Sequence, residues 1–368
     1  MQPKIAALLA LLLGLTLVIV DRPGSASAQN AKSWLYLNSF QSQKLIAIDP
    51  ATGRVESTIE VDDLAGSLGA AVTSDGRTLL IVDGDTKSRL RMLNAATRQP
   101  IAEQIFYHRL LLLGGGPTVH LTADDRWLFA KTYDYAAAAK GIRVFDIANR
   151  RFTPVGLRDR DCNDVNFASA RDGRLIAICP GFLQELQPLS PNVPGEWTGS
   201  KVPTSIESPA DSTLTSDGDV LYALGYFEAG RPWLLNRWTR GQPQASVRDL
   251  RDVLDIHGDI PDPRGRAVPA MALSPDAKTF AVVAGPHIWL VDSATMHVVG
   301  HWLESSPVDR PAFTRDGKEI LAMRHLDGGR AELLRMSTVT RDITRVPLDH
   351  LGMNFIAGAA TFIVAPAP

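Results

Sequence analysis

The stretch "LSPDAKTFAVVAGPHIWLVDSATMHVVG" (residues 273–300) contains three apolar segments separated by turns. It opens with a Ser-Pro-Asp turn and continues through "KTFAVVAG", "HIWLVD", the turn "SATM" and "HVVG". Short runs of β-branched and aromatic residues between turn residues are typical of β-strands. The stretch therefore predicts three consecutive strands joined by tight turns.

The opening turn recurs along most of the chain. Its copies are "TSDG" at 73–76, "TADD" at 122–125, "ARDG" at 170–173, "TSDG" at 215–218, "SPDA" at 274–277 and "TRDG" at 314–317. The Asp at the third position of each turn serves as a marker, and successive markers are 49, 48, 45, 59 and 40 residues apart, about 48 on average. Asp can hydrogen-bond its own backbone and Gly tolerates a positive φ, so these residues turn the chain. A period of this length matches one blade of a β-propeller.

A second turn repeats in step with the first. Its copies are "IDPATG" at 48–53, "LNAATR" at 93–98, "FDIANR" at 145–150 and "VDSATM" at 291–296. Each follows an apolar run such as "KLIAI" and precedes another strand-like run. The runs are apolar on both faces, as expected of sheets that are covered on both sides. We therefore predict four-stranded antiparallel sheets stacked face to face in a closed ring, because a linear stack would expose two apolar end faces.

The N-terminal residues predict an exported protein. Lys4 precedes an apolar run of 16 residues (5–20), and the small residues "ASA" follow at 26–28. The run is shorter than the roughly 20 residues needed to span a bilayer. A membrane anchor is the alternative, but the pattern favours a signal peptide of residues 1–28, cleaved after Ala28. The mature chain, residues 29–368, would be a single periplasmic or secreted propeller domain.

The ends of the chain indicate how the ring closes. The 340 residues of the predicted mature chain give seven blades of about 49 residues each. Counting back one period from Asp75 reaches the signal peptide, so the first blade lacks an inner strand of its own. The tail "MNFIAGAATFIVAPAP" (353–368) offers a strand without later partners. We predict an all-β, seven-bladed propeller closed by pairing N- and C-terminal strands, with either "NFIA" or "TFIVA" as the closing strand.

Two resemblances support this fold. The phrases "ALSPDAKTFAVV" and "IWLVDSATMHVV" resemble the YVTN-type propeller repeat, which covers nearly all of the mature chain. His120–Gly181 contains a turn, an apolar strand, a "VFD" strand, "DC" and a second Cys one hairpin later. That order is similar to the heavy subunit of methylamine dehydrogenase and related quinoprotein amine dehydrogenases. The resemblance implies a periplasmic propeller without a cofactor of its own, which holds a small subunit carrying a tryptophan-derived quinone.

The same resemblance matches Cys162 and Cys179 to the paired cysteines of that family. An oxidising compartment would allow them to pair. If "ARDG" is a four-residue hairpin loop, Ser169 faces Arg174 and Cys179 lies opposite Asp164. Cys162 is then one diagonal away on the same face, where a small bulge would bring the sulfurs within bonding range. A reactive thiol or a metal-binding pair is the alternative, but it needs an electropositive or His-rich setting. We expect a structural disulfide.

The sequence contains no ready-made catalytic signature. It lacks a G-x-S-x-G elbow, an H-E-x-x-H motif, a C-x-x-C-H haem site and a P-loop. A net charge of −2 argues against a nucleic-acid-binding protein. The Gly-rich "LLLLGGGP" (110–117) precedes a strand rather than a helix, so it is expected to connect strands instead of binding phosphate.

One loop has the residue types of a ligand or metal site. The segment 252–269, "DVLDIHGDIPDPRGRAVP", lies in the longest interval between turn markers. Loops that precede inner strands surround the central channel on one face of a propeller, so Asp255, His257, Asp259 and Asp262 could hold a hard cation or a transition metal there. A solvated polar insertion is the alternative.

Two aromatic stretches could form a protein-binding surface. Aromatic residues and Arg are enriched at interface hot spots. In a propeller such residues also wedge between blades as core, and this alternative stays open. The Pro-rich stretch Pro188–Trp197 is predicted to be a surface loop. The candidate partner-binding residues are Tyr133, Tyr135, Tyr226, Phe227, Arg231 and Trp233.

The leading functional hypothesis is an exported, non-catalytic propeller that acts as a binding scaffold. It would carry no cofactor itself and would bind a protein partner, such as a small quinone-bearing subunit. The alternative is a propeller enzyme, a lactonase or another hydrolase with or without a metal, acting at the channel mouth. A surface or envelope binding module without a redox connection is a third hypothesis.

Overall fold

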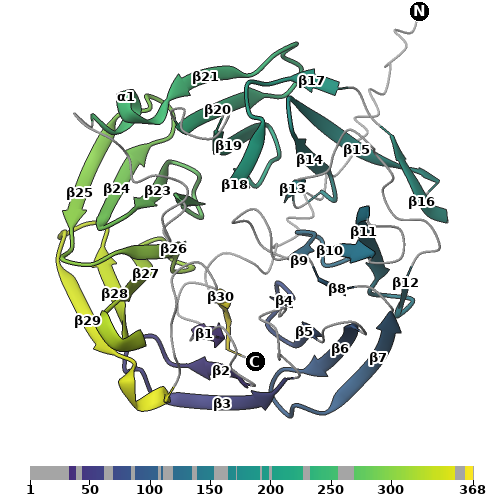
Figure 1. The fold of residues 1–368 in the computed structure, drawn as a ribbon, viewed down its shortest axis with the longest axis horizontal. Helices are drawn as coiled ribbons and strands as arrows, with labels where there is room; N and C mark the ends of the chain where they lie inside the picture. The colour runs from purple at the N-terminus through teal and green to yellow at the C-terminus, as the bar shows by residue number, and fades with distance from the viewer. Residues whose placement is uncertain are drawn as a thin grey trace, which may run out of the picture. The chain divides into compact units, whose positions relative to one another are not determined.

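The computed structural model of the chain is a seven-bladed β-propeller, which confirms the predicted fold (Figure 1). The chain divides into two compact units, Met1–Ala31 and Lys32–Pro368, and the first lies outside the described residues. Within the second unit, the innermost strands of the blades surround the centre and the outermost strands form the rim (Figure 1). The structure describes residues 33–38, 44–61, 69–83, 88–106, 109–110, 119–134, 139–152, 165–170, 172–190, 193–198, 201–226, 233–255, 269–352 and 361–367.

Each blade is an antiparallel sheet built on a plan of four strands, numbered here from the inside outward. Blade 1 contains β30 (Thr361–Pro366), β1 (Ser33–Asn38), β2 (Lys44–Ile48) and β3 (Val55–Glu60). Blade 2 contains β4 (Gly69–Val72), β5 (Thr78–Asp83), β6 (Ser88–Asn94) and β7 (Pro100–Phe106). Blade 3 has a divided inner strand, β8 (Arg109–Leu110) and β9 (Val119–Leu121), followed by β10 (Trp127–Asp134), β11 (Ala139–Asp146) and β12 (Arg151–Phe152).

The remaining blades follow the same plan, with a divided outer strand in blade 4. Blade 4 contains β13 (Asn166–Ser169), β14 (Leu175–Cys179), β15 (Phe182–Ser190) and the divided outer strand β16 (Val193–Thr198) and β17 (Lys201–Pro203), and blade 5 contains β18 (Ser208–Leu214), β19 (Val220–Tyr226), β20 (Trp233–Thr239) and β21 (Ser246–Asp249), followed by helix α1 (Leu250–Leu254). Blade 6 contains β22 (Ala270–Leu273), β23 (Thr279–Ala284), β24 (His287–Asp292) and β25 (Val298–Leu303). Blade 7 contains β26 (Val308–Phe313), β27 (Glu319–His325), β28 (Ala331–Ser337) and β29 (Ile343–Pro347), with the short 3₁₀ helices η2 (Asp327–Gly329) and η3 (Asp349–Leu351).

The first repeated turn joins the inner strand of a blade to the second strand, and its side chains hold it closed. In blade 3 the Thr122 hydroxyl donates to Asp124 Oδ1 at 2.6 Å and accepts the Trp127 N–H at 3.0 Å. The same pair of contacts forms in blades 2, 5, 6 and 7. Blades 3 and 6 have no Gly in the turn, and Asp125 and Ala277 adopt a positive φ there. The turns are therefore mechanical devices, as predicted.

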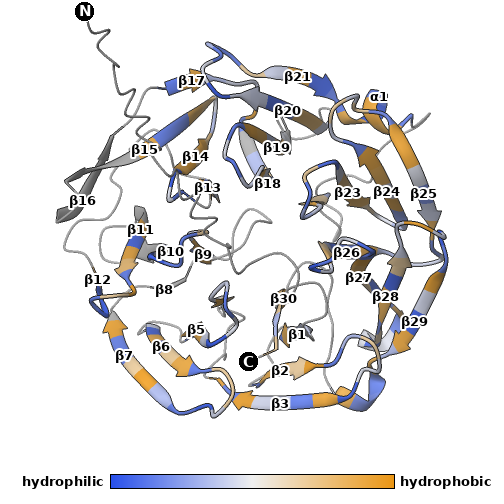
Figure 2. Ribbon diagram, turned by 180° about the vertical axis from the view of Figure 1, so that it is seen from behind, coloured by the Kyte–Doolittle hydropathy of each residue, from blue (hydrophilic) through white to orange (hydrophobic). Residues whose placement is uncertain are grey.

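Apolar side chains fill the space between neighbouring blades. Among the described residues, the buried apolar side chains form seven clusters, one for each pair of neighbouring blades. Hydrophobic residues follow the strands, whereas the turns are largely hydrophilic (Figure 2). Within β5, for example, Leu79 to Val82 are at most 1% exposed although successive side chains point to opposite faces. Each blade is therefore covered on both sides.

Strand β30 closes the ring by pairing with β1 along the full length of both strands. Ser33 pairs with Pro366 and Asn38 with Thr361. The closing strand is thus the "TFIVA" half of the tail, whereas "NFIA" lies outside the described residues. This confirms that both ends of the chain contribute to blade 1.

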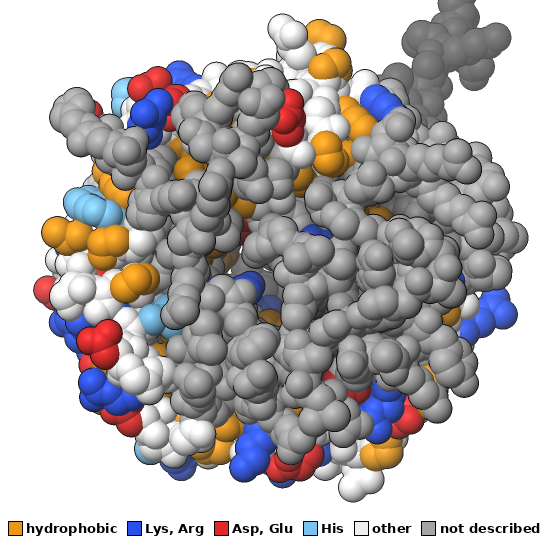
Figure 3. Space-filling view, in the orientation of Figure 1, with side chains coloured by type: hydrophobic (Ala, Val, Ile, Leu, Met, Phe, Trp, Pro, Cys, Tyr) orange, Lys and Arg blue, Asp and Glu red, His pale blue; other side chains and the backbone are white. Residues whose placement is uncertain are grey.

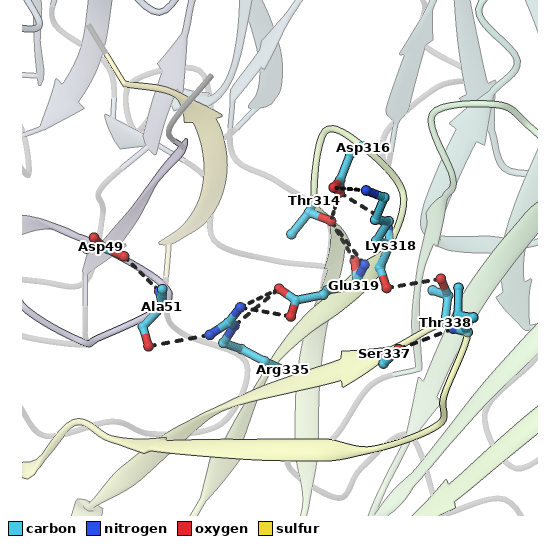
Figure 4. A network of polar contacts seen from close by, with 10 residues as sticks. Asp49, Ala51, Thr314, Asp316, Lys318, Glu319, Arg335, Ser337 and Thr338 are labelled. Carbon is cyan, nitrogen blue, oxygen red and sulfur yellow. Dashed lines mark hydrogen bonds and ion pairs between the residues drawn. The ribbon is translucent and has the colours of Figure 1, made fainter. Parts of the chain in front are cut away.

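Polar contacts also join blade 7 to blade 1 (Figure 4). The Arg335 guanidinium bridges to the Glu319 carboxylate at 2.8 Å and reaches the Ala51 carbonyl of blade 1 at 3.4 Å. His350 Nε2 lies 2.9 Å from the Gly53 carbonyl oxygen, also across this seam. The junction of blades 7 and 1 therefore combines the apolar cluster between them with polar contacts to the outer turn of blade 1.

Blade 4 departs from two predictions. Pro188–Trp197, predicted to be a loop, belongs to a hairpin in which Pro188 pairs with Trp197. The hairpin tolerates its prolines because a register shift lies between Pro188 and Ser190 and because prolines fit irregular or edge strands. Ser169 pairs with Leu175 rather than with Arg174, because the Ala170 N–H bonds the Arg174 carbonyl and so makes the turn one residue longer. Among the helices that the structure describes, none has the length and apolar character to span a membrane.

Replacing Thr122 with Ala is expected to lower the free energy of unfolding by about 1–3 kcal/mol. The side chain is 1% exposed, so its loss leaves the buried Trp127 N–H without that acceptor. Thr122→Ser is the matched control and should cost less, because Ser274 makes the same contacts in blade 6. Urea unfolding followed by circular dichroism measures both variants. Equal losses would show that the methyl group, not the hydroxyl, stabilises the turn.

Candidate functional site

Three polar residues occupy the same position on three inner strands. Asn166, Asp211 and Arg310 each lie four residues before the first repeated turn of blades 4, 5 and 7. The corresponding residues of blades 2 and 6 are the small Gly69 and Ala270. Inner strands surround the centre of the ring (Figure 1), so this position brings polar residues of blades 4, 5 and 7 and small residues of blades 2 and 6 to the inner strands at equivalent places.

Side-chain hydrogen bonds link the polar residues from blade to blade. Lys131, on the second strand of blade 3, donates from Nζ to Asn166 Oδ1 at 2.5 Å. Asn166 in turn donates from Nδ2 to the Pro209 carbonyl of blade 5 at 3.2 Å. Both side chains are at least nine-tenths buried. Three blades are therefore connected through buried polar groups close to the channel.

Asp211 continues this series into blade 6. Its Oδ2 accepts the Met271 N–H and its Oδ1 accepts the Ser212 N–H, each at 2.8 Å. Burial raises the pKa of the Asp211 carboxyl to about 6, although these hydrogen bonds and the charges of Arg310 and Lys131 act in the opposite direction. The carboxyl is thus poised between its charged and neutral forms near neutral pH.

The imidazole of His120, close to Lys131, is uncharged at neutral pH. Its Nε2 is 3.0 Å from the Ser169 hydroxyl, which also accepts the Ala123 N–H at 2.9 Å. Burial, followed by the charge of Lys131, lowers the pKa of His120 to about 4. The imidazole therefore takes part in hydrogen bonding but not in proton exchange at neutral pH. We call His120, Lys131, Asn166, Asp211 and Arg310 the inner-strand cluster.

Backbone irregularities place two members of the cluster. The pairing of β18 with β19 shifts between Pro209 and Asp211, and that of β26 with β27 shifts between Asp309 and Ala312. Arg310 has a φ of 54° within the second irregularity. Bulges of this kind redirect side chains and are common next to functional sites. These residues were not predicted, although a Pro two residues from an Asp in "SPADS" and "VDRPAF" signals an interrupted strand.

A cavity of about 550 Å³ opens among the first repeated turns, at the other ends of the inner strands. Ser74, Ala123 and Arg315 contribute to its wall, and each is the second residue of its turn. The closing strand contributes Val364, Ala365 and Pro366. From the sequence we expected these turns only to reverse the chain direction. The structure shows that the second residue of three of them also lines a cavity.

The structure describes only part of the predicted ligand loop. Asp255 ends α1 in a left-handed conformation with a φ of 52°, whereas His257, Asp259 and Asp262 lie outside the described residues. Within the described ranges, no group of three or more His, Cys, Asp or Glu side chains is arranged to hold a metal ion. The metal site at this loop stays a prediction.

The predicted partner surface is likewise described in part. Trp233 is 2% exposed and packs in the cluster between blades 5 and 6, in agreement with the core alternative. Tyr133 and Tyr226 lie in β10 and β19, but their side chains are not among the described ones. Tyr135, Phe227 and Arg231 fall outside the described residues altogether.

The cysteine pair remains a prediction as well. Cys179 is buried at the end of β14, with 1% of its surface exposed. Cys162 lies outside the described residues. The observed register places Val165, not Asp164, opposite Cys179, because every pair between β13 and β14 is displaced by one residue from the expected one.

The inner-strand cluster suits binding better than bond-breaking chemistry. The contacts of Lys131, Asn166 and Asp211 join neighbouring blades. Lys or Arg atoms are visible in a small hollow near the centre of the ring (Figure 3). Such an arrangement can position a polar or anionic group by charge and hydrogen bonding.

No protein-family profile matches the sequence, and no curated protein sequence does either. Among solved structures, a protein of unknown function from Desulfotomaculum acetoxidans is 11% identical, with a TM-score of 0.65 over 91% of this chain and 99% of that one. A candidate 6-phosphogluconolactonase from Bacteroides uniformis is 15% identical, with a TM-score of 0.60 over 90% and 100%. Dihydro-heme d1 dehydrogenase NirN, in complex with DHE, is 15% identical, with a TM-score of 0.54 over 90% and 75%. At these identities the similarities establish the propeller fold alone.

Replacing Asp211 with Asn should change the pH dependence of stability. Because the folded-state pKa is raised, the stability contributed by this carboxyl is complete below its unfolded pKa and is lost as the pH rises through about 6. The advantage of the wild-type protein over Asp211→Asn is therefore expected to shrink between pH 4.5 and pH 7.5, by about 2 kcal/mol. Urea unfolding at several pH values measures this difference.

Asp217→Asn provides a control of opposite sign. Hydrogen bonds, chiefly from Thr215, lower the pKa of Asp217, so its contribution is present at neutral pH and is lost as the pH falls. A pH-independent difference between wild type and Asp211→Asn would contradict the assignment of a raised pKa to Asp211.

Proposed function

We propose that the chain is an exported binding propeller, a rigid scaffold that holds a protein partner and has no catalytic activity of its own. The observation that carries this proposal is the use of the inner-strand polar groups as contacts between blades. Lys131 bonds Asn166, Asn166 bonds the Pro209 carbonyl, and Asp211 bonds the Met271 N–H. These contacts stiffen the channel wall, which favours presentation of a fixed surface.

A catalytic centre would need a different arrangement. A general base or nucleophile must direct a lone pair at its substrate and is usually oriented by a second group. Both oxygens of Asp211 instead accept backbone N–H groups, and the pKa of His120 is too low for it to exchange protons near neutral pH. The absence of a catalytic signature from the sequence agrees with this interpretation.

The partner we propose follows from the resemblance of His120–Gly181 to amine dehydrogenase heavy subunits. It is a small subunit that carries a tryptophan-derived quinone, while this chain binds no cofactor. The proposal includes export to the periplasm with removal of residues 1–28, and a disulfide between Cys162 and Cys179. The burial of Cys179 supports a structural rather than a reactive cysteine, because a reactive thiol is usually accessible.

A gentle purification of the full chain from the exported fraction of the organism that encodes it tests this function. We expect a small copurifying chain, an absorption band of a protein-derived quinone, and no titratable thiol until the protein is denatured and reduced. A reduced-and-alkylated sample of the same preparation serves as the control for thiol counting. A solitary, colourless protein would contradict the quinone-subunit proposal, and retention of residues 1–28 would contradict export with processing.

A hydrolase is the second candidate, and the raised pKa of Asp211 favours it. A carboxyl with a pKa of about 6 can act as a general base close to neutral pH. The similarity to a candidate 6-phosphogluconolactonase makes lactones the substrate class to examine. In this case one backbone N–H bond to the carboxyl would have to give way when substrate binds.

Lactone hydrolysis by purified wild type and Asp211→Asn distinguishes the two candidates. A hydrolase that uses Asp211 should gain activity as the pH rises through about 6 and should lose it by about 10²–10⁴-fold in the Asn variant. The non-catalytic proposal predicts that both proteins hydrolyse 6-phosphogluconolactone no faster than buffer. Equal turnover by both proteins, above the rate in buffer, would exclude Asp211 as the base.

A further inference from the structure

Two histidines meet on the outer strands of blade 6. Strands β24 and β25 are antiparallel, with Trp289 paired to His301 and His287 paired to Leu303. Since side chains two residues apart share a face of a strand, His287, Trp289 and His301 lie on the same face of the sheet. This group is separate from the inner-strand cluster, and an inference from it does not depend on the function proposed above.

The two imidazole rings share a plane. His287 Nδ1 lies 3.0 Å from His301 Nε2, the ring centroids are 5.3 Å apart, and the planes differ by 12°. The centroid separation exceeds the nitrogen separation by about one imidazole width, so the rings meet edge to edge through one shared hydrogen. Two nitrogen ligands therefore already face each other before any ion is bound.

Trp289 forms a floor beneath this pair. Its ring is nearly parallel to both imidazoles, with centroid distances of 5.0 Å to His287 and 5.3 Å to His301. The indole is 4% exposed and packs in the apolar cluster between blades 5 and 6, so its position is fixed by the core. The floor limits the orientations of both imidazoles, which reduces the entropy lost when they bind a common ligand.

The spacing of the two nitrogens suits a metal ion. Ligands that bind one ion at about 2.0–2.1 Å in neighbouring positions lie roughly 3.0–3.4 Å apart. Metal binding also requires neutral imidazoles. Partial burial lowers the pKa of His287, and burial followed by the nearby His287 lowers the pKa of His301, so both rings favour the neutral form at neutral pH.

We propose that His287 and His301 form a surface site for a divalent first-row transition metal, with Cu²⁺ bound most tightly. The ion takes the place of the shared hydrogen, and the ring that donated this hydrogen keeps it on its other nitrogen, so no net proton is released. Because an ion about 2.0–2.1 Å from both nitrogens lies off the line that joins them, each ring turns by roughly 40° to direct its lone pair at the ion. Copper is preferred because nitrogen sites follow the Irving–Williams order.

Such a site would leave coordination positions open. Across the described part of the chain, no third His, Cys, Asp or Glu completes a metal-binding group with the pair. The remaining positions would be occupied by water or by a donor from another molecule. The site is therefore an exchangeable one on the rim of the ring, unlike a closed structural metal site.

Trp289 supplies the readout for a direct test. Full-length protein without an affinity tag is titrated with CuSO₄ at neutral pH, and bound copper is counted after ultrafiltration while tryptophan fluorescence is recorded. We expect one tight equivalent and a saturable decrease in fluorescence. His287→Asn and His301→Asn each remove a direct ligand, so each should weaken copper binding by more than the roughly 10–100-fold that loss of a residue supporting a ligand costs. Trp289→Phe should bind copper but lose much of the fluorescence change.

His297→Asn is the matched control, since it removes an exposed histidine of the same hairpin outside the pair. It should leave copper binding unchanged. The proposal is overturned if the double variant of His287 and His301 binds copper as tightly as the wild type, or if wild type binds no stoichiometric copper. Circular dichroism of each variant confirms that the fold is retained, so a loss of binding reports on the ligands themselves.

Discussion

The structure depends on one constraint: every blade is apolar on both faces and therefore needs a neighbour on each side. A sheet such as β4 to β7 cannot be stable alone, because side chains on both faces of β5 are withdrawn from water only by contact with blades 1 and 3. The pairing of β1 with β30 satisfies this requirement for the whole ring, since it completes the blade that lies between blades 2 and 7. It also removes the open sheet edge that β1 would otherwise present.

Closure leaves the innermost and outermost strands of each blade with one free edge, and most of the inner-strand cluster lies along the inner edges. Inner strands have a partner on one side only, so some of their N–H groups face the channel without a sheet partner. The Asp211 carboxylate accepts one of these groups, at Met271, while Asn166 donates to a carbonyl at Pro209. The contacts of the inner-strand cluster that the structure shows therefore connect neighbouring blades. This physical relationship explains why polar residues can be buried there, and it is the reason that we favour a scaffold over a catalyst.

The sequence predicted the repeated features well because each depends on a few neighbouring residues. The turn at Thr122–Asp125 needs only a hydroxyl and a carboxylate two residues apart, and the closing strand "TFIVA" is a plain apolar run. The inner-strand cluster was not predicted because the equivalence of Asn166, Asp211 and Arg310 becomes visible only when the blades are superimposed and the bulges are placed. The histidine pair depends on cross-strand register after a shift between Leu290 and Val291, which single-sequence patterns do not specify. The prediction of a loop at Pro188–Trp197 was wrong because proline, although rare in regular strands, is acceptable in an irregular hairpin.

The composition of blade 1 has a consequence for synthesis. A ribosome delivers β1, β2 and β3 first and β30 only after the other six blades have been made, so the first three strands must wait for their inner partner. During that time blades 2 and 7 have no completed neighbour between them, and nascent chains expose apolar faces to chaperones and proteases. A message that ends before the codon for residue 361 would yield a product with nearly every strand but no closed ring. Closing the ring therefore requires a strand that is synthesised after every other blade.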